Sequence, residues 1–272
     1  MVTTKFISES PIGVFDSGLG GLTVLKSLEK ILPKESFIYF GDTAHVPYGS
    51  KSASTVIRYS RDIVDFFLTH NTKAIVIACN TASAVAYQEL KNSYDIPLFD
   101  VVAPSVEYSN DISRTRKIGV IGTYNTINSK AYTKSLADIK SDCSVVEIAC
   151  PLFVPIIEEG WSNTPIAREV AHTYLHEFQK TETDTLILGC THYSIMAETI
   201  QGVVDNHVQL VYSGETVGSK LSSYIDKNNY KNESGSIKKT RFYVTDFPQK
   251  FDDLGSRFLG RKMEHVEHVS LT

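Results

Sequence analysis

The chain has 272 residues, of which 42% are hydrophobic, a size that suits one large domain or two modest ones. Its 27 Lys and Arg against 31 Asp and Glu give a formal net charge of −4, without the basic block that nucleic-acid binding requires. The apolar runs have the length of strands rather than of membrane helices, so we expect a soluble protein that binds no membrane. Residues 1–11 do not show the basic and then apolar pattern of a secretory signal, and the four cysteines include no C-x-x-C pair, so we expect a cytoplasmic protein.

Strand-like and helix-like segments alternate over the first hundred residues. The predicted elements are a strand at Ile12–Phe15, a helix from about Thr23, a strand at Phe37–Phe40, a helix from about Ser52, a strand at Ala74–Ala78 and a helix at Ala82–Lys91. The helix from Ser52 repeats apolar residues such as Val56, Ile63 and Phe67 along one face. The unbroken aliphatic run Ala74–Ala78 is typical of a parallel strand that is buried on both faces. This alternation predicts an α/β fold.

A second series of the same kind follows. The strand Leu98–Val102 runs into Pro104, where we expect the chain to leave one sheet for another. The elements predicted after it are a strand at Lys117–Ile121, a helix at Asn128–Ile139, and strands at Val145–Ile148 and Leu186–Leu188. The chain therefore repeats its plan.

Two pairs of blocks support an internal duplication. Ile12–Gly18 matches Ile118–Thr123, and Ile75–Thr81 matches Leu186–His192, so each half ends an aliphatic strand with a cysteine and polar residues. The interval from the first Gly-Val to its cysteine is 66 residues, and the second interval is 71. We expect two similar parallel-sheet α/β domains related by pseudo-two-fold symmetry, with the active site in the cleft between them.

The elements that follow residue 208 decide where the expected domains begin and end. Its predicted elements are a strand at Gln209–Tyr212, a helix from about Gly214, a polar surface loop at Asp226–Lys239, a strand at Arg241–Thr245, a helix at Phe247–Phe258 and a closing segment at Val266–Leu271. Returning them to the first sheet is the most economical arrangement. The predicted domains are therefore 1–102 plus 209–272, and 103–208.

Cys79 and Cys190 are the cysteines that the repeat singles out. Ligands of open α/β sheets collect at the carboxyl ends of strands, where helix N-termini present free N–H groups. Such a position lowers a thiol pKa from about 8.5, so we expect accessible thiolates. Cys143 and Cys150 lack this setting and are interpreted as packing residues.

Two matched thiols on opposed domains suit racemisation. Inverting a carbon that carries a proton requires removal from one face and delivery to the other, and hence an acid/base group on each side. A redox pair would require the two thiols to touch, whereas groups that flank a carbon stay apart.

Four blocks now resemble the signatures of the bacterial glutamate racemase family, within the aspartate/glutamate racemase superfamily. The blocks are Asp16-Ser17-Gly18-Leu19-Gly20-Gly21, Pro47-Tyr48-Gly49, Cys79-Asn80-Thr81-Ala82 and Cys190-Thr191-His192-Tyr193. The resemblance runs from Ile12 to about Gly218. It includes Gly122-Thr123 with Thr126, and Pro151–Pro155 before Glu158.

This resemblance implies a cofactor-independent enzyme, without pyridoxal phosphate or metal, that interconverts L- and D-glutamate and supplies D-glutamate for peptidoglycan. It implies that Cys79 acts on D-glutamate and Cys190 on L-glutamate. A homodimer is also expected from the family.

Three further residues are candidates for proton transfer. Asp16 opens a Gly-rich turn at a strand end, where it is either a functional carboxylate or the N-cap of the next helix. His192 suits a proton relay beside Cys190. Glu158 is either part of the same machinery or a solvated helix end. The predicted substrate-binding residues are Asp16, Ser17, Tyr48, Gly49, Asn80, Thr81, Thr123, Thr126, Thr191 and His192.

Three other functions are compatible with parts of the sequence. A dinucleotide loop at Gly18–Gly21 is rejected because Thr23 replaces the third glycine and Asp16 would repel pyrophosphate. A binding module without catalysis leaves the twin thiols unexplained. A racemase of aspartate or hydantoins would share the fold, and the sequence alone leaves it open.

Overall fold

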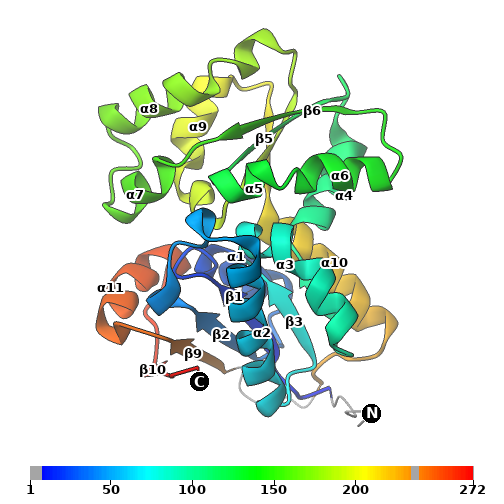
Figure 1. Cartoon of the computed structure of the whole chain (residues 1–272), viewed down its shortest axis with the longest axis vertical. Coiled ribbons are helices and arrows are strands. Elements are labelled where there is room, and N and C mark those ends of the chain that lie inside the picture. Colours follow the sequence, from blue (N-terminus) through cyan, green and yellow to red (C-terminus); the bar gives the residue numbers. More distant parts are fainter. Residues whose placement is uncertain (1–7, 234–238, 272) are drawn as a thin grey trace.

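The computed structural model describes residues 8–233 and 239–271, and within them the chain forms two parallel sheets in separate lobes (Figure 1). The first sheet holds β1 (Ile12–Asp16), β2 (Phe37–Gly41), β3 (Ala74–Ile77), β4 (Leu98–Asp100), β9 (Thr240–Val244) and β10 (Val266–His268). The second sheet holds β5 (Lys117–Gly122), β6 (Ser144–Ala149), β7 (Thr185–Gly189) and β8 (Gln209–Tyr212). The predicted fold class is confirmed.

The same strand order occurs in both sheets. The first sheet runs β10-β9-β2-β1-β3-β4 and the second β6-β5-β7-β8, so β1, β2, β3 and β4 correspond to β5, β6, β7 and β8. Every pairing is parallel. In both units the order reverses between the first strand and the third, and the crevice beyond the carboxyl ends at such a reversal is where open α/β sheets bind ligands.

Helices pack around the two sheets. The first sheet is accompanied by α1 (Leu22–Ile31), α2 (Ala53–Thr69), α3 (Asn80–Ser93), α10 (Ser213–Lys227) and α11 (Pro248–Leu259). The second is accompanied by α4 (Val102–Ile112), α5 (Tyr124–Asn128), α6 (Ala131–Asp138), α7 (Phe153–Glu158), α8 (Pro165–Leu175) and α9 (Ala197–Val204). Short 3-10 helices occupy Thr43–His45, Tyr48–Ser50, Phe178–Lys180 and Thr191–Met196. No helix of the described residues has the length and apolarity needed to cross a membrane.

The α2 helix shows how the apolar pattern builds the core. The Ser52 side chain caps its first turn by accepting from the Thr55 N–H at 3.3 Å. The predicted apolar face is buried, and Phe67 packs so closely on β1 that a Cβ at Gly13 would lie 2.9 Å from its ring. The glycine therefore permits the helix to contact the strand.

The expected placement of 209–272 in the first domain is wrong for one strand. β8 pairs with β7 from Thr185↔Gln209 to Leu188↔Tyr212, so it completes the second sheet. The chain returns to the first lobe through α10, which contacts both α1 and α4 (Figure 1). β9 and β10 then extend the first sheet beside β2, as predicted.

The chain leaves the first sheet after β4 and enters the second at β5, with Pro104 between them, as expected. Two local expectations differ from the structure. The strand before Pro104 ends at Asp100 rather than at Val102, and Pro104 lies in the first turn of α4, where a backbone N–H would have no helical partner. The helix expected at Asn128–Ile139 corresponds to α6 but begins at Ala131, because Lys130 has a left-handed backbone, with φ of 55°; the short helix α5 before it was not expected.

The polar segment Asp226–Lys239 was expected to be a surface loop. Its first residues extend α10, and residues 234–238 lie outside the described part of the chain. Asn232 is buried, and its N–H donates to Glu35 Oε1 at 3.0 Å. Lys73 Nζ contacts Glu35 Oε2 at 2.5 Å and the Tyr230 carbonyl oxygen at 2.8 Å. These contacts hold the segment against the first lobe.

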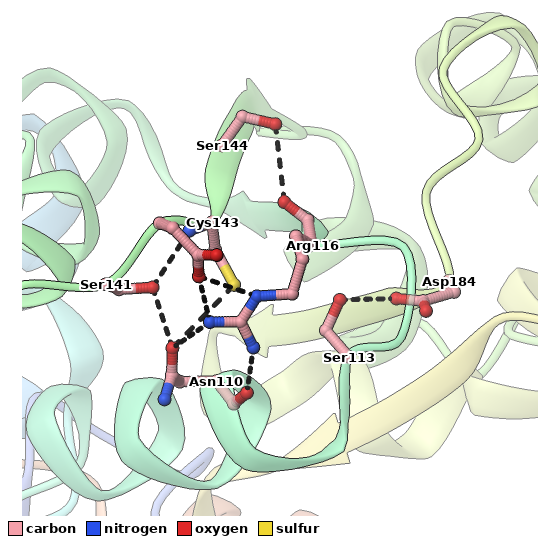
Figure 2. A network of polar contacts seen from close by, with 8 residues as sticks. Asn110, Ser113, Arg116, Ser141, Cys143, Ser144 and Asp184 are labelled. Atoms are coloured by element: carbon pink, nitrogen blue, oxygen red, sulfur yellow. Dashed lines mark hydrogen bonds and ion pairs between the residues drawn. The ribbon is translucent and has the colours of Figure 1, made fainter.

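A polar network ties the amino-terminal edge of the second sheet to α4 (Figure 2). Arg116 donates to the Asn110 carbonyl oxygen at 2.8 Å and pairs with Asp142. Asp184 accepts from the Ser113 hydroxyl at 2.7 Å and from two backbone N–H groups. This edge is opposite the carboxyl ends that carry the candidate site.

Candidate active site

Cys79 and Cys190 stand at equivalent places in the two lobes. Cys79 follows β3 and precedes α3, and Cys190 follows β7, the corresponding strand. Both residues line one cavity of about 370 Å³ between the lobes, a volume within the range of small-molecule sites. Each is nearly buried, and all four cysteines are free thiols. The resting state therefore holds no disulfide.

The cavity brings together the predicted site residues except Thr126. From the first lobe it is lined by Asp16, Ser17, Gly18, Leu19, Val46, Pro47, Tyr48, Gly49, Ser50, Cys79, Asn80 and Thr81, and from the second by Thr123, Tyr124, Pro151, Val154, Pro155, Glu158, Gly189, Cys190, Thr191 and His192. Thr126 is fully buried behind this wall, with its hydroxyl 3.2 Å from that of Thr81 and 3.1 Å from that of Thr123.

The Cys79 side of the cavity carries the Asp16 carboxylate. The Cys79 sulfur accepts from the Ala82 N–H at 3.5 Å and donates to the Ser17 hydroxyl at 3.8 Å. Burial, followed by the charge of Asp16, nevertheless raises the pKa of the Cys79 thiol to about 12. The expectation of a lowered thiol pKa is wrong for Cys79, because the hydrogen bonds of Ala82 and Ser17 to its sulfur do not offset burial and the Asp16 charge.

Asp16 is not the N-cap of α1. Its Oδ2 accepts from the Gly18 N–H at 2.9 Å, while the cap position belongs to Gly21, which has no side chain. Burial raises the pKa of Asp16, although the nearby His192 favours its charged form. Asp16 is thus a buried carboxyl group at the end of β1, facing the machinery of the other lobe.

The Cys190 side of the cavity carries a histidine. The Cys190 sulfur lies 3.9 Å from His192 Nδ1, and His192 Nε2 lies 3.1 Å from Glu158 Oε1. Burial opposes a charge on the ring, but the contacts with Cys190 and Glu158 outweigh it and raise the pKa of His192 to about 10. Because 43% of the Glu158 side chain is exposed, this chain of contacts leads from the sulfur to solvent.

The segment after Cys190 differs from the one after Cys79. Cys190 is followed by the 3-10 helix Thr191–Met196 rather than by an α-helix, and its side chain accepts no capping hydrogen bond. A Cβ at Gly20 would lie 2.1 Å from Thr191 Oγ1 and 2.4 Å from His192 Nδ1. Because Gly20 has no side chain, the Gly-rich turn of the first lobe can pack directly against Thr191 and His192 of the second lobe.

Asp42 supports the cavity and is not among the predicted site residues. It is fully buried after β2, where Oδ2 accepts from the Tyr48 hydroxyl at 2.5 Å and Oδ1 from the Thr245 hydroxyl at 2.8 Å. An acid immediately after a buried strand is the sequence signal that could have identified it. Burial, and then the Asp42 charge, raises the pKa of Tyr48, so its hydroxyl remains a donor.

Asn125 and Tyr132 join the lobes at the cavity and were also missed. Asn125 Nδ2 donates to the carbonyl oxygens of Tyr48 and Lys51 at 3.0 and 2.5 Å. The Tyr132 hydroxyl donates to Asn80 Oδ1 at 2.7 Å. Their partners lie 52 to 77 residues away in the chain, beyond the reach of a local motif.

Comparison with known proteins gives a consistent result. Residues 12–217 match the family model described as Asp/Glu/hydantoin racemase. A glutamate racemase of Geobacter metallireducens is 43% identical over 260 residues, covering 96% of each chain. The structure of a Francisella tularensis glutamate racemase in complex with D-glutamate has a TM-score of 0.91 at 41% identity, covering 97% of this chain and 99% of that one. A glutamate racemase isoform of Bacillus anthracis has a TM-score of 0.93 at 33% identity, covering 97% and 98%.

Proposed function

Because the chain belongs to the Asp/Glu/hydantoin racemase family, we propose that it interconverts L- and D-glutamate by means of two thiols and supplies D-glutamate for peptidoglycan. Relatives of this identity named for glutamate favour that substrate over aspartate or hydantoins. The enzyme is an isomerase.

The observation that carries the mechanism is the pair Cys79 and Cys190, which reach one cavity from corresponding strands of opposed lobes. In one direction the thiolate of one cysteine removes the α-proton, and the thiol of the other delivers a proton to the opposite face of the carbanion. After the reaction the first cysteine is a thiol and the second a thiolate. This form of the enzyme is the one that starts the reaction in the reverse direction.

The two sides provide the charges that this exchange needs. A protonated His192 places a positive charge 3.9 Å from the Cys190 sulfur, while the raised pKa of Cys79 keeps that group a thiol. In the direction from L-glutamate, Cys190 removes the α-proton and the Cys79 thiol delivers one to the other face. Asp16 on one side, and His192 with Glu158 on the other, carry protons to and from the sulfurs.

Neutral donors suit the two carboxylates of glutamate. The cavity presents Ser17, Asn80, Thr81, Thr123 and Thr191, which can hydrogen-bond a carboxylate without adding a cation beside the thiolate. Tyr48 and Gly49 lie in the 3-10 helix Tyr48–Ser50, where a Cβ at Gly49 would lie 3.0 Å from the Thr123 side chain. These two residues close the cavity against the second lobe.

An isotope experiment tests the proposal. Purified protein is incubated with D-glutamate in deuterated water without pyridoxal phosphate, and the L-glutamate formed is analysed by mass spectrometry. The mechanism requires deuterium at the α-carbon, because the delivered proton comes from an exchangeable thiol. L-Glutamate that forms without deuterium would exclude the two-thiol mechanism, and absence of L-glutamate would exclude the racemase activity.

A further inference from the structure

Asn80 is held in an unusual way at the junction of the two lobes. It is the first residue of α3, directly after Cys79, and lines the cavity while only 3% of the residue is exposed. An amide side chain has an accepting oxygen and a donating nitrogen, and only the nitrogen can bind a carboxylate. The function of Asn80 therefore depends on which way its amide faces.

The amide oxygen is secured from outside α3. The Tyr132 hydroxyl, in α6 of the second lobe, donates to Asn80 Oδ1 at 2.7 Å, and the Ser213 hydroxyl at the start of α10 lies 3.4 Å from the same atom. Tyr132 is completely buried, and burial, followed by the charge of Asp100, raises its phenol pKa well above the ordinary value. The hydroxyl thus keeps its proton and acts as a donor.

The amide nitrogen is in the opposite situation. Asn80 Nδ2 is buried but has no hydrogen-bond partner among the residues that the structure describes. A buried donor without an acceptor destabilises the protein unless something pairs with it. Because the amide is planar and its oxygen is held by Tyr132, the nitrogen points away from Tyr132, and the residue borders the cavity.

We propose that Tyr132 is a positioning residue that fixes the Asn80 amide with its nitrogen available to a carboxylate of the bound substrate. This inference rests on the proposed function and adds to it a residue that does not line the cavity. Because Tyr132 belongs to the second lobe and Asn80 to the first, the approach of the lobes also sets the orientation of the amide.

The test is the kinetics of Tyr132→Phe, which keeps the ring and removes the donor. Without the donor the amide can turn its oxygen toward the carboxylate, so KM for both enantiomers of glutamate should rise by about tenfold. The kcat should stay within about twofold, because the thiols are untouched. A fall in kcat at unchanged KM would overturn the proposal, as would unchanged values of both.

A double-mutant cycle separates positioning from general damage. In an Asn80→Ala background the amide is gone, so adding Tyr132→Phe should change KM by less than about twofold. A further tenfold rise in that background would show that Tyr132 acts by another route and would overturn the proposal.

Two more variants guard against misfolding. If Tyr132→Phe does not fold, Ser213→Ala removes the hydroxyl that lies 3.4 Å from Asn80 Oδ1 and 3.3 Å from the Leu188 carbonyl oxygen. This variant should raise KM by about two- to threefold, and no rise would count against the proposal. Thr199→Val is the matched control, since it removes a buried hydroxyl that donates to the Ser162 carbonyl oxygen at 2.7 Å outside the cavity. Its KM should be unchanged, and an equal rise would overturn the proposal.

Wild-type protein assayed in parallel distinguishes failure of the proposed function from failure of the role proposed for Tyr132. Wild type without racemase activity would overturn the proposed function and this inference together. Active wild type with an unaltered Tyr132→Phe would overturn the inference alone.

Discussion

The two halves of the site have the same architecture and different electrostatics. Cys79 and Cys190 follow corresponding strands, yet Cys79 lies near the Asp16 carboxylate and Cys190 beside the His192 ring. Burial and the Asp16 charge favour a proton on Cys79, whereas a protonated His192 places a positive charge 3.9 Å from the Cys190 sulfur. Strand position thus places the reacting groups, and the charges beside them differ between the two halves.

This asymmetry has a thermodynamic limit. The enantiomers of glutamate have equal free energy in water, so kcat/KM must be the same in both directions for every variant. Differences between the halves can appear only in kcat and KM taken separately, or in isotope effects on the individual proton transfers.

Loss of either thiol is the largest expected effect. Cys79→Ala and Cys190→Ala should each lower racemisation by about 10⁴-fold or more, because one face of the carbon then lacks its acid/base group. Circular dichroism should show an intact fold in both variants. Near-normal turnover by either one would remove that cysteine from the mechanism.

Replacing the histidine tests the Cys190 half alone. His192→Asn removes the cation and the link to Glu158, so kcat/KM should fall by about 10²- to 10³-fold equally in both directions. α-Deuterated L-glutamate should then show a larger isotope effect on kcat/KM than α-deuterated D-glutamate, since removal of its proton by Cys190 becomes the slow step. A larger effect with the D enantiomer would reverse the assignment of the two faces.

Gly20 tests how closely the halves must meet. In Gly20→Ala the new methyl group would overlap Thr191 and His192, and a displacement of this kind should lower kcat by about 10²-fold. Gly202→Ala is a matched control, because nothing lies within 4 Å of a Cβ at that position. The kcat of Gly20→Ala is compared with that of Gly202→Ala. Equal kcat values would contradict the prediction that turnover requires close packing of the two lobes at Gly20.

The pH dependence of stability gives a smaller effect. Because the folded-state pKa of His192 is raised from 6.5 to about 10, its contribution is fully present below pH 6.5 and is lost as pH rises through 10. Because the pKa of Cys79 is also raised, from 9.0 to about 12, ionisation of this thiol likewise lowers the free energy of unfolding as pH rises above 9. Urea unfolding should therefore show a free energy of unfolding that falls from pH 7 to pH 10, and the fall should be shallower in His192→Asn. An identical fall in the two proteins would contradict the raised pKa of His192.

The smallest effect is expected at the opposite edge of the second sheet. Arg116→Ala breaks the exposed network of Figure 2, which touches neither cysteine of the cavity, so racemisation should be unchanged. A large loss of activity in this assay would mean that the Cys190 half depends on distant contacts.

The sequence predicted the parts of the molecule that repeat. Buried aliphatic runs identified β3 and β7 and put a cysteine after each, because burial on both faces leaves a strong compositional signal. The placement of β8 was missed because a four-residue apolar segment does not indicate which sheet it will join. The start of α6 at Ala131 was missed because a lysine gives no warning of a left-handed backbone.

In the site, too, the sequence identifies residues by their local position and misses residues whose partners are distant in the chain. The Cys, Asp and His positions follow from strand ends, and so could Asp42, whereas Asn125 and Tyr132 act through partners 52 to 77 residues away. The raised pKa of Cys79 depends on burial between the two lobes and on the Asp16 charge, neither of which its place at a helix start reveals.

The most direct test of the central claim is solvent exchange without inversion. Cys79→Ala and Cys190→Ala are each incubated with L- and D-glutamate in deuterated water, and α-deuterium is measured in the unchanged enantiomer. Each remaining thiol can still remove a proton from its own face and return deuterium there. We predict exchange of L-glutamate only in Cys79→Ala and of D-glutamate only in Cys190→Ala. Exchange of both enantiomers by one variant would contradict the claim that each thiol serves one face.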